Sequence, residues 1–285
     1  YKKLNMSKKN SNVILKSNFK NFKNFHNIYL EFDRKLSKFK YKSFVVAISG
    51  GPDSLALAAL SKYYSLSKKS KFSYVLVNHN IRKGSSKEAI KVKNLLKKND
   101  INLQIINNKK KILKNIQGEA RKVRYSILER FCKRKKIKII LTAHNLEDQV
   151  ETFLIRLSRG SGLTGLSSMK PLTILKNNIT LYRPFLNIKK KILIRITKKV
   201  FGKYFLDPSN KDEKFLRTKM RNLQKHLLKS GIKYDQIIKS INNLAISRNT
   251  LDEYLEKIKK DTVKKLNKRV LINIEKFNQY NLDIK

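Results

Sequence analysis

Six residues between two apolar stretches carry the clearest chemistry of this chain. Residues 44–49 read as a strand, and the loop SGGPDS at Ser49–Ser54 follows directly before small apolar residues that predict a helix. Two glycines let the backbone approach a ligand closely, and the loop can turn its N–H groups toward an anion. Asp53 or Ser54 can cap the helix, whose positive dipole end also favours phosphate. The loop therefore predicts a phosphate site, but not a Walker A loop, which needs Gly-Lys-Ser/Thr after a four-residue spacer.

Three carboxylates gather at the start of another predicted helix. Glu147, Asp148 and Glu151 follow an apolar strand that ends near Ala143. Residues three or four positions apart share a helix face, so these carboxylates could hold Mg²⁺ with phosphates, or the amino group of a substrate. The simpler alternative is that they complement the helix dipole, at about 0.3–1 kcal/mol each. Because the chain has only 20 acidic residues, three within five positions beside His144 favour a functional role.

Histidine and arginine residues follow the other predicted strands. His79 and Arg82 lie at and just after the end of a strand predicted at residues 74–79. His79 could contact adenosine or assist proton transfer, although a hydrogen-bonded loop histidine is the plainer interpretation of this residue alone. Arg121 and Arg124 lie three positions apart and share a helix face. They could stabilise phosphate charge, or they could belong to a solvated basic face.

A glycine-rich segment adds further arginines. The sequence RGSGLTGL at Arg159–Leu166 predicts a flexible loop, and Arg183 precedes a proline further along the chain. Glycine-rich loops flanked by arginine can close over phosphates or a nucleotide. Surface loops often have the same composition, so this segment by itself is weak evidence.

The order of the predicted elements explains how these residues meet. Strands predicted at residues 44–49, 74–79, 101–106 and 137–143 alternate with helices at 54–64, 87–98, 119–135 and 147–157. This alternation predicts an α/β fold, with a parallel sheet and helices on both faces. Ligands bind at the carboxyl ends of the strands in such sheets. We therefore expect the phosphate loop, the His79 segment and the carboxylates at one edge of the sheet.

The chain changes character after Gly160. A short strand is predicted at residues 180–185, a helix at 188–200 and a turn at 207–210, and the chain reads as helical from about Arg217. We predict a basic extension over residues 1–40, a catalytic domain over 41–225 and a small helical module over 226–285. Residues 1–30 contain no acidic residue. They could be a flexible basic arm on RNA or an organellar leader.

Composition sets the broad class. The chain has 285 residues, 40% hydrophobic content and a net charge of +47, which attracts polyanions. Abundant Lys, Asn and Ile also suggest A+T-rich codons, so compositional drift is an alternative source of the charge. Only 14 arginines occur, and eight of them fall within the segments described above and below, which points to specific contacts. A single cysteine, Cys132, excludes an internal disulfide framework, and no apolar run is long enough for a membrane helix.

Taken in order, these segments resemble the tRNA(Ile)-lysidine synthetase family of ATP pyrophosphatases. That family has SGGxDS, a His-x-x-Arg stretch, an EAxxxRY helix, AHHxDDQxET, RGSGxxGLxxM, RP, and D-x-SN-x-D with RNxxR. The resemblance covers roughly residues 44–225. The corresponding segments are Ser49–Ser54, His79–Arg82, Glu119–Tyr125, Ala143–Thr152, Arg159–Met169, Arg183-Pro184, Asp207–Asp212 and Arg217–Arg221.

Three positions depart from the family pattern. Asn145 replaces the second histidine of AHHxDD, Glu147 replaces its first aspartate, and Thr218 replaces the asparagine of RNxxR. None of these changes removes a charge type, so we expect activity with altered substrate positioning. The part after residue 225 is shorter than in long family members, which implies that some of their tRNA-contacting region is missing.

The resemblance implies an adenine nucleotide α-hydrolase-like, Rossmann-like fold with a five-stranded type of sheet and a C-terminal helical module. It implies use of ATP and Mg²⁺ to attach free L-lysine to C2 of cytidine 34 in tRNA(Ile) with a CAU anticodon. An adenylated cytidine forms first, and pyrophosphate and then AMP leave. It also implies a cytoplasmic protein, with the mitochondrial matrix or plastid stroma as alternatives, and a possible homodimer.

From the residues and the resemblance together we predict three groups of site residues. The ATP-binding group is Ser49, Gly50, Gly51, Pro52, Asp53, Ser54, His79 and His144. The catalytic group is Asp53, Arg121, Arg124, Glu147, Asp148 and Glu151, with Asp53 and Asp148 as candidate metal ligands. The tRNA-binding group is Arg82, Arg159, Arg183, Arg217 and Arg221.

Two alternative functions remain open on the sequence. One is another tRNA-modifying ATP pyrophosphatase, such as a thiolase. Thiolases of this kind use paired cysteines or an iron–sulfur cluster, which Cys132 alone does not supply. The other is a non-catalytic basic RNA-binding protein, which predicts a damaged nucleotide loop, whereas all six loop positions are present.

Overall fold

The computed structural model describes residues 12, 15, 23–82, 84–110, 112, 116–206, 216–266 and 269–281. Their contacts divide them between two compact units. The first unit comprises the described residues of Tyr1–Gln149 and Lys170–Thr218, and the second comprises those of Val150–Met169 and Lys219–Lys285. Helices α6 (Leu146–Leu157) and α9 (Leu216–Lys229) each begin in the first unit and end in the second.

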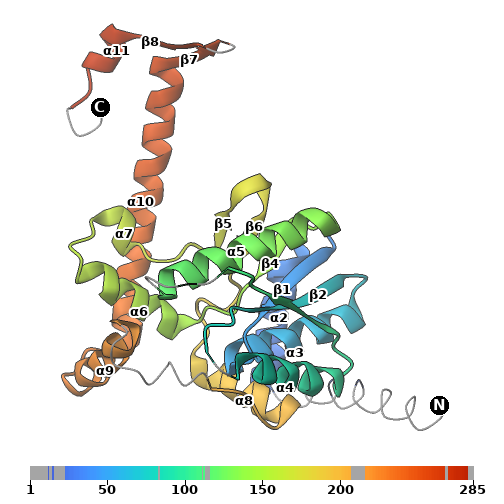
Figure 1. Ribbon diagram of the computed structural model, residues 1–285. Coiled ribbons are helices and arrows are strands. Elements are labelled where there is room, and N and C mark those ends of the chain that lie inside the picture. The colour runs from blue at the N-terminus through green and yellow to red at the C-terminus, as the bar shows by residue number, and fades with distance from the viewer. Residues whose placement is uncertain are drawn as a thin grey trace. The chain divides into compact units, whose positions relative to one another are not determined.

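The first unit is an α/β structure (Figure 1). Its strands are β1 (Ser43–Ile48), β2 (Lys71–Asn78), β3 (Leu103–Asn107), β4 (Ile139–Leu141), β5 (Leu172–Ile174) and β6 (Thr180–Tyr182). Its helices besides α6 are α2 (Lys23–Ser37), α3 (Pro52–Ser67), α4 (Ser85–Lys97), α5 (Ile116–Lys135), the 3₁₀ turn η1 (Lys176–Asn178) and α8 (Lys190–Phe201).

The strands form one sheet in the order β3-β2-β1-β4-β6-β5. Five of them pair in parallel, with Val46 opposite both Tyr74 of β2 and Leu141 of β4. This confirms the predicted α/β fold with its parallel sheet. The strand β5 was not predicted: it pairs antiparallel with β6 at the edge of the sheet, and its three residues are too few to show a period in the sequence.

Alternation along the strands supplies both layers of the core. Val46 of β1 faces a cluster built with α2, α3, α4 and α8, whereas the adjacent Val45 faces a second cluster built with α5. Helix α3 is apolar around its circumference, and every side chain from Leu55 to Leu60 is fully buried. It packs against the sheet, α2 and α8, which explains why a helix of this composition is stable here.

Parallel pairing brings the predicted site segments to one edge of the sheet. Strands β2, β1 and β4 are neighbours and run in the same direction. The phosphate loop follows β1, the His79 segment follows β2, and Thr142 follows β4. The convergence expected from the sequence is therefore confirmed.

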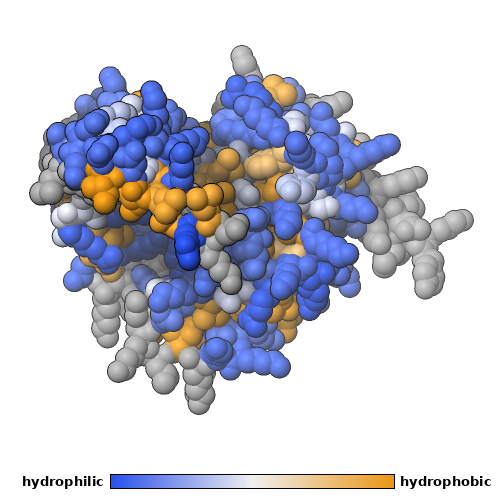
Figure 2. Space-filling view, turned by 90° about the horizontal axis from the view of Figure 1, so that it is seen from above, coloured by the Kyte–Doolittle hydropathy of each residue, from blue (hydrophilic) through white to orange (hydrophobic). Residues whose placement is uncertain are grey.

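The second unit is mainly helical, as predicted for the C-terminal part. It contains most of α6 and α9, the short helix α7 (Leu163–Leu166), the 29-residue helix α10 (Tyr234–Thr262) and α11 (Ile274–Asn278). A hairpin of β7 (Val263–Leu266) and β8 (Arg269–Ile272) was not predicted. Hydrophilic side chains cover most of the face in Figure 2, with hydrophobic side chains gathered in a band. Two hydrophobic residues of the hairpin, Leu266 and Val270, are exposed to solvent.

The division into compact units adds detail to the predicted domains. Helix α2 lies within the predicted basic extension, yet Phe32 and Leu36 of this helix are buried in the main core. Residues 150–169 group with the C-terminal helices rather than with the sheet. The functional boundaries at residues 40 and 225 stay a prediction. Within the described residues no helix is both long enough and apolar enough to span a membrane.

Candidate nucleotide site

The loop after β1 is held by its own serines. Ser54 Oγ lies 3.1 Å from both the backbone nitrogen and Oγ of Ser49, and it donates to the carbonyl of Gly51 at 3.0 Å. Ser54 is buried. The predicted capping by Asp53 or Ser54 is wrong. Helix α3 has Gly51 as its N-cap without a side-chain hydrogen bond, and it begins at Pro52, whose fixed φ suits the first helical position.

Gly50 is the position in this loop where glycine is required. Its φ is +86°, and a Cβ there would lie 2.6 Å from Val92 Cγ2 of α4. Its carbonyl accepts a hydrogen bond from the backbone nitrogen of Phe205 at 3.0 Å. Gly51, in contrast, has an extended conformation, and the nearest atom to an added Cβ would be 3.6 Å away. Gly50 is therefore needed for the conformation of the loop, whereas the space around Gly51 would accommodate a Cβ.

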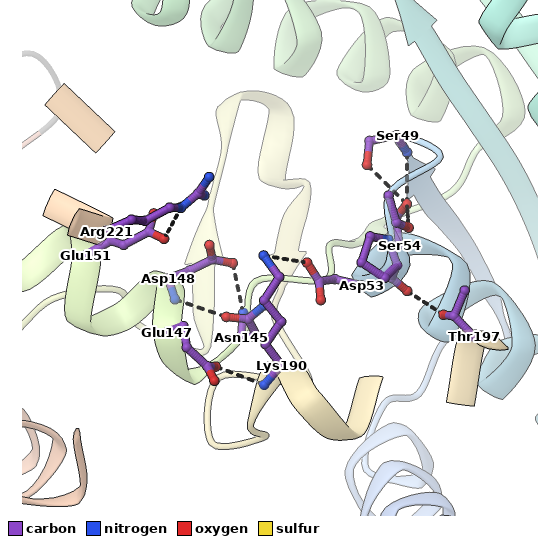
Figure 3. Close-up of polar contacts among 12 residues, drawn as sticks. Ser49, Asp53, Ser54, Asn145, Glu147, Asp148, Glu151, Lys190, Thr197 and Arg221 are labelled. Atoms are coloured by element: carbon purple, nitrogen blue, oxygen red, sulfur yellow. Dashed lines mark hydrogen bonds and ion pairs between the residues drawn. The ribbon is translucent and has the colours of Figure 1, made fainter. Parts of the chain in front are cut away.

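Asp53 is the central carboxylate of the site (Figure 3). Its Oδ1 is buried and has no hydrogen-bond partner among the described residues, and its Oδ2 lies 3.9 Å from Lys190 Nζ. Burial raises the pKa of Asp53 to about 6, helped by the nearby charges of Asp148 and Glu147, while Lys190 and the Asn145 amide lower it. An ionised carboxylate with an unpaired buried oxygen is suited to a bound cation.

The start of α6 forms a reciprocal cap. The backbone nitrogen of Asn145 donates to Asp148 Oδ2 and the backbone nitrogen of Asp148 donates to Asn145 Oδ1, both at 3.0 Å. Asn145 is fully buried, and its Nδ2 makes no hydrogen bond of good geometry among the described residues. The residue that replaces the family's second histidine is therefore an N-cap, because its short amide reaches the first turn.

Glu147 and Glu151 have separate structural partners. Glu147 Oε2 accepts a hydrogen bond from the backbone nitrogen of Lys190 at 2.9 Å, so it caps the N-terminus of α8. Glu151 is buried and forms a forked ion pair with Arg221 of α9, at 2.5 Å and 3.3 Å. Glu151 thus has a structural partner in Arg221, and its catalytic role stays a prediction. The described residues contain no group of three His, Cys, Asp or Glu side chains arranged to hold a metal ion.

His144 lies among arginines. Its Nδ1 is 3.0 Å from Thr142 Oγ1. Burial is the main cause that lowers the pKa of His144 well below its usual value, and four guanidinium groups lower it further. These groups belong to Arg121, Arg183, Arg217 and Arg124. The imidazole is therefore neutral at pH 7, and a positive region forms next to it that could stabilise phosphate charge.

His79 has an unusual environment for a loop histidine. Both of its ring nitrogens are buried and have no hydrogen-bond partner among the described residues. Burial and the charge of Arg124 lower its pKa to about 4. The loop itself is fixed by the Asn78 amide, which donates to the side chains of Asn80 and Asn107 at 2.7 and 3.1 Å. The described residues therefore do not supply the hydrogen bond that the plainer interpretation of His79 expects.

The predicted tRNA-binding arginines differ in their surroundings. Arg82 forms a fork with Glu88 at 3.1 and 2.6 Å, and Arg159 is exposed on the turn after α6. Arg183 is buried and donates to the carbonyl of Lys170 at 2.7 Å and to Thr173 Oγ1 at 2.8 Å, so it supports the edge strand β5. Their roles toward tRNA stay predictions. The segment Asp207–Asp212 lies outside the described residues.

Two residues of α8 belong to the site but were not predicted. Lys190 approaches Asp53, and Thr197, which is fully buried, donates to the carbonyl of Pro52 at 2.6 Å (Figure 3). Lysine is too abundant in this chain for Lys190 to stand out. The helix that carries both residues is far from the loop in sequence, so only the tertiary fold reveals the contacts.

Comparison with known proteins agrees with this geometry. A family model described as "PP-loop domain" matches residues 23–227. The chain is 36% identical over 209 residues to a tRNA(Ile)-lysidine synthase of Orientia tsutsugamushi, covering 71% of this chain and 46% of the relative. It is 42% identical over 194 residues to a tRNA(Ile)-lysidine synthase of Wolbachia pipientis wMel, covering 66% of this chain and 44% of the relative. The chain therefore spans about half the length of these curated relatives.

A solved structure shares the fold. The U34-tRNA thiolase NcsA from Methanococcus maripaludis, solved with its [4Fe-4S] cluster, aligns with a TM-score of 0.61 at 18% sequence identity. The alignment covers 77% of this chain and 79% of the thiolase chain. At this identity the similarity concerns the fold alone. The family match extends over all six strands of the sheet, the SGGPDS loop and α6. The chain belongs to the PP-loop domain family.

Proposed function

We propose that this protein is a tRNA(Ile)-lysidine synthase, which joins lysine to C2 of cytidine 34 in the CAU anticodon of tRNA(Ile) at the expense of ATP. The observation that carries the proposal is the 36–42% identity to proteins of that name over the segment that builds the site. An intact nucleotide loop beside a buried, unpaired Asp53 oxygen supports it.

The proposed reaction has two steps. The C2 carbonyl oxygen of the cytidine attacks the α-phosphorus of ATP, and the bond to the β-phosphate breaks so that pyrophosphate leaves. The amino group of lysine then attacks C2, AMP leaves with the oxygen, and the amine releases a proton.

The chain offers positive groups for the first step. The backbone of Ser49–Ser54 and the N-terminus of α3 would bind the phosphates of ATP. Arg121 and Arg124, which both act on His144, would stabilise negative charge that develops on the transferred phosphoryl group. Lys190 would neutralise a phosphate beside Asp53.

The carboxylates would bind the two cations of the proposed reaction, Mg²⁺ and the lysine ammonium. Asp53 and Asp148 would hold Mg²⁺, because Asp53 Oδ1 is buried without a partner and the Asp148 charge acts on it. When bound, the metal would neutralise phosphate charge. Asp53, Glu147 and Asp148 also provide negative charge for the lysine ammonium and an acceptor for its proton.

Incorporation of radiolabelled lysine into an unmodified tRNA(Ile) CAU transcript, with ATP and Mg²⁺, tests the proposal. We expect ATP-dependent label on this tRNA and none on a tRNA(Met) control. ATP–pyrophosphate exchange without label would mean that the nucleotide site is active and the acceptor is wrong.

A thiolase function is not favoured. Cys132, the single cysteine of the chain, is fully buried among apolar residues of α5 and the sheet. Burial raises the pKa of its thiol to about 12, so it would not form a reactive thiolate. A cytoplasmic location and a homodimer remain part of the proposal.

A further inference from the structure

Two arginines from different helices donate hydrogen bonds to the glycine-rich segment of the second unit, residues 160–168. Arg156 of α6 donates to the carbonyls of Gly165 and Ser168 at 2.6 and 3.0 Å. Arg248 of α10 donates to Ser167 Oγ at 2.7 Å and to the carbonyl of Thr164 at 3.4 Å. All four acceptors lie in or just after α7, which packs against α10.

These contacts hold a segment with little intrinsic preference for its shape. Gly160 and Ser168 both have positive φ, at 67° and 58°, and a Cβ at Gly165 would lie 2.5 Å from Ser161 Cβ. Ser167 and Ser168 are nevertheless buried. Since α7 is a single turn, it has little stability of its own, and the donors from Arg156 and Arg248 add to the few hydrogen bonds within the segment.

The arginines around this segment therefore have different surroundings. The Arg248 side chain is only 14% exposed, and its Nε lies 3.5 Å from Asp252 of the same helix. Arg159, at the start of the segment, is exposed. A partly buried guanidinium that already donates to a serine hydroxyl and a backbone carbonyl is less available to a phosphate than an exposed one.

We infer that Arg248 is a positioning residue, which fixes the loop of residues 160–168 so that Arg159 is presented to a phosphate of the RNA substrate. The inference rests on the proposed function for the identity of the RNA. Arg248 lies outside the segment matched by the family model, at residues 23–227, so it links α10 to a loop of the matched region.

Hydrogen exchange tests the positioning without any substrate. Amides of the loop, such as those of Leu166 and Ser167, donate within the turn. In the full chain, Arg248→Met should accelerate their exchange at least about tenfold, because the loop opens more often. Lys257→Met is the matched control: it removes the same charge from an exposed position of α10 and should leave these amides unchanged. Unchanged exchange in Arg248→Met would overturn the inference.

Salt dependence of RNA binding separates positioning from direct contact. With the tRNA(Ile) CAU transcript as probe, Arg159→Met should weaken binding and lower the slope of log K against log salt by about one, the signature of a lost phosphate contact. Arg248→Met should weaken binding about fivefold with an unchanged slope, and Arg248→Lys should recover part of the loss. A reduced slope in Arg248→Met, or unchanged affinity, would overturn the inference.

The two proposals can fail separately. If no lysine is incorporated but the exchange and slope results are as expected with this RNA, the proposed function fails and the role of Arg248 stands. If lysine is incorporated and Arg248→Met behaves like Lys257→Met, only the inference about Arg248 fails.

Discussion

At the scale of single residues, Asp53 is the carboxylate on which most charged groups of the site act. Its carboxylate lies in the first turn of α3, near Asp148 and Glu147, with Lys190 as its counter-charge. Burial is the largest cause of its raised pKa, about 6. A carboxylate whose pKa is higher in the folded state than in the unfolded chain costs stability once both are ionised, so this cost grows as pH rises from about 4 through 6.

Asp53→Asn should therefore separate stability from activity. The amide keeps the shape and removes the charge, so at pH 7.5 in EDTA the variant should be as stable as the unsubstituted protein, or more stable by about 1 kcal/mol. ATP–pyrophosphate exchange should fall at least about 100-fold, because the proposed metal ligand and phosphate-site charge are lost. Urea unfolding and exchange assays on the same preparation provide both numbers. A variant that is much less stable would contradict this account of Asp53.

The two glycines of the loop should tolerate alanine differently. Gly50→Ala places a Cβ against Val92 and holds an alanine at a positive φ, which strains its backbone. We therefore expect a loss of about 1–3 kcal/mol in the free energy of unfolding. Gly51→Ala, which has room and an extended backbone, should lose less than about 1 kcal/mol. Equal losses in denaturant titrations would show that the strain at Gly50 is not decisive.

At the scale of elements, α8 supports the nucleotide loop from a distance in sequence. Its N-terminus is capped by Glu147, and Thr197 on its buried face donates to the carbonyl of Pro52. The segment after α8 contributes a second hydrogen bond to the loop, from the backbone nitrogen of Phe205 to the carbonyl of Gly50. The loop therefore takes its position from α8 as well as from β1 and α3.

Thr197→Val should loosen this support. The substitution keeps the size of the side chain and removes the hydroxyl, which should cost about 1–2 kcal/mol of stability and raise the KM for ATP more than it lowers kcat. Thr197→Ser retains the hydroxyl and should restore the KM while leaving a small packing defect. An unchanged KM in the valine variant, measured by ATP–pyrophosphate exchange, would limit Thr197 to a role in packing.

At the scale of the whole molecule, charge dominates the surface. A net charge of +47 should bind any RNA strongly at low salt, and the specific part should emerge as salt screens the rest. We expect affinity for tRNA(Ile) CAU to fall at least about tenfold between 50 and 200 mM salt, while its ratio to tRNA(Met) rises. A ratio near one at all salt concentrations, in filter-binding titrations, would indicate that the charge reflects composition and not recognition.

Sequence reasoning was most reliable for patterns that depend on local spacing. The alternation of strands and helices predicted the parallel sheet, and the SGGPDS loop was correctly placed at the start of a helix. The edge strand β5 and the β7–β8 hairpin were not predicted, because strands of three or four residues are too short to show an alternating pattern. The N-cap of α3 was misplaced because Pro52 starts the helix earlier than the side-chain oxygens suggested.

Local periodicity and loop composition were enough to indicate which residue types could bind a nucleotide and at which strand ends they occur. How each charge is used depends on contacts that form in the folded chain. The tertiary structure paired Glu151 with Arg221, turned Glu147 into a cap for α8, buried Arg183 and brought Lys190 to Asp53. These contacts join residues up to 137 positions apart, as from Asp53 to Lys190. The strength of such contacts depends on burial and distance in space, which spacing along the chain does not encode.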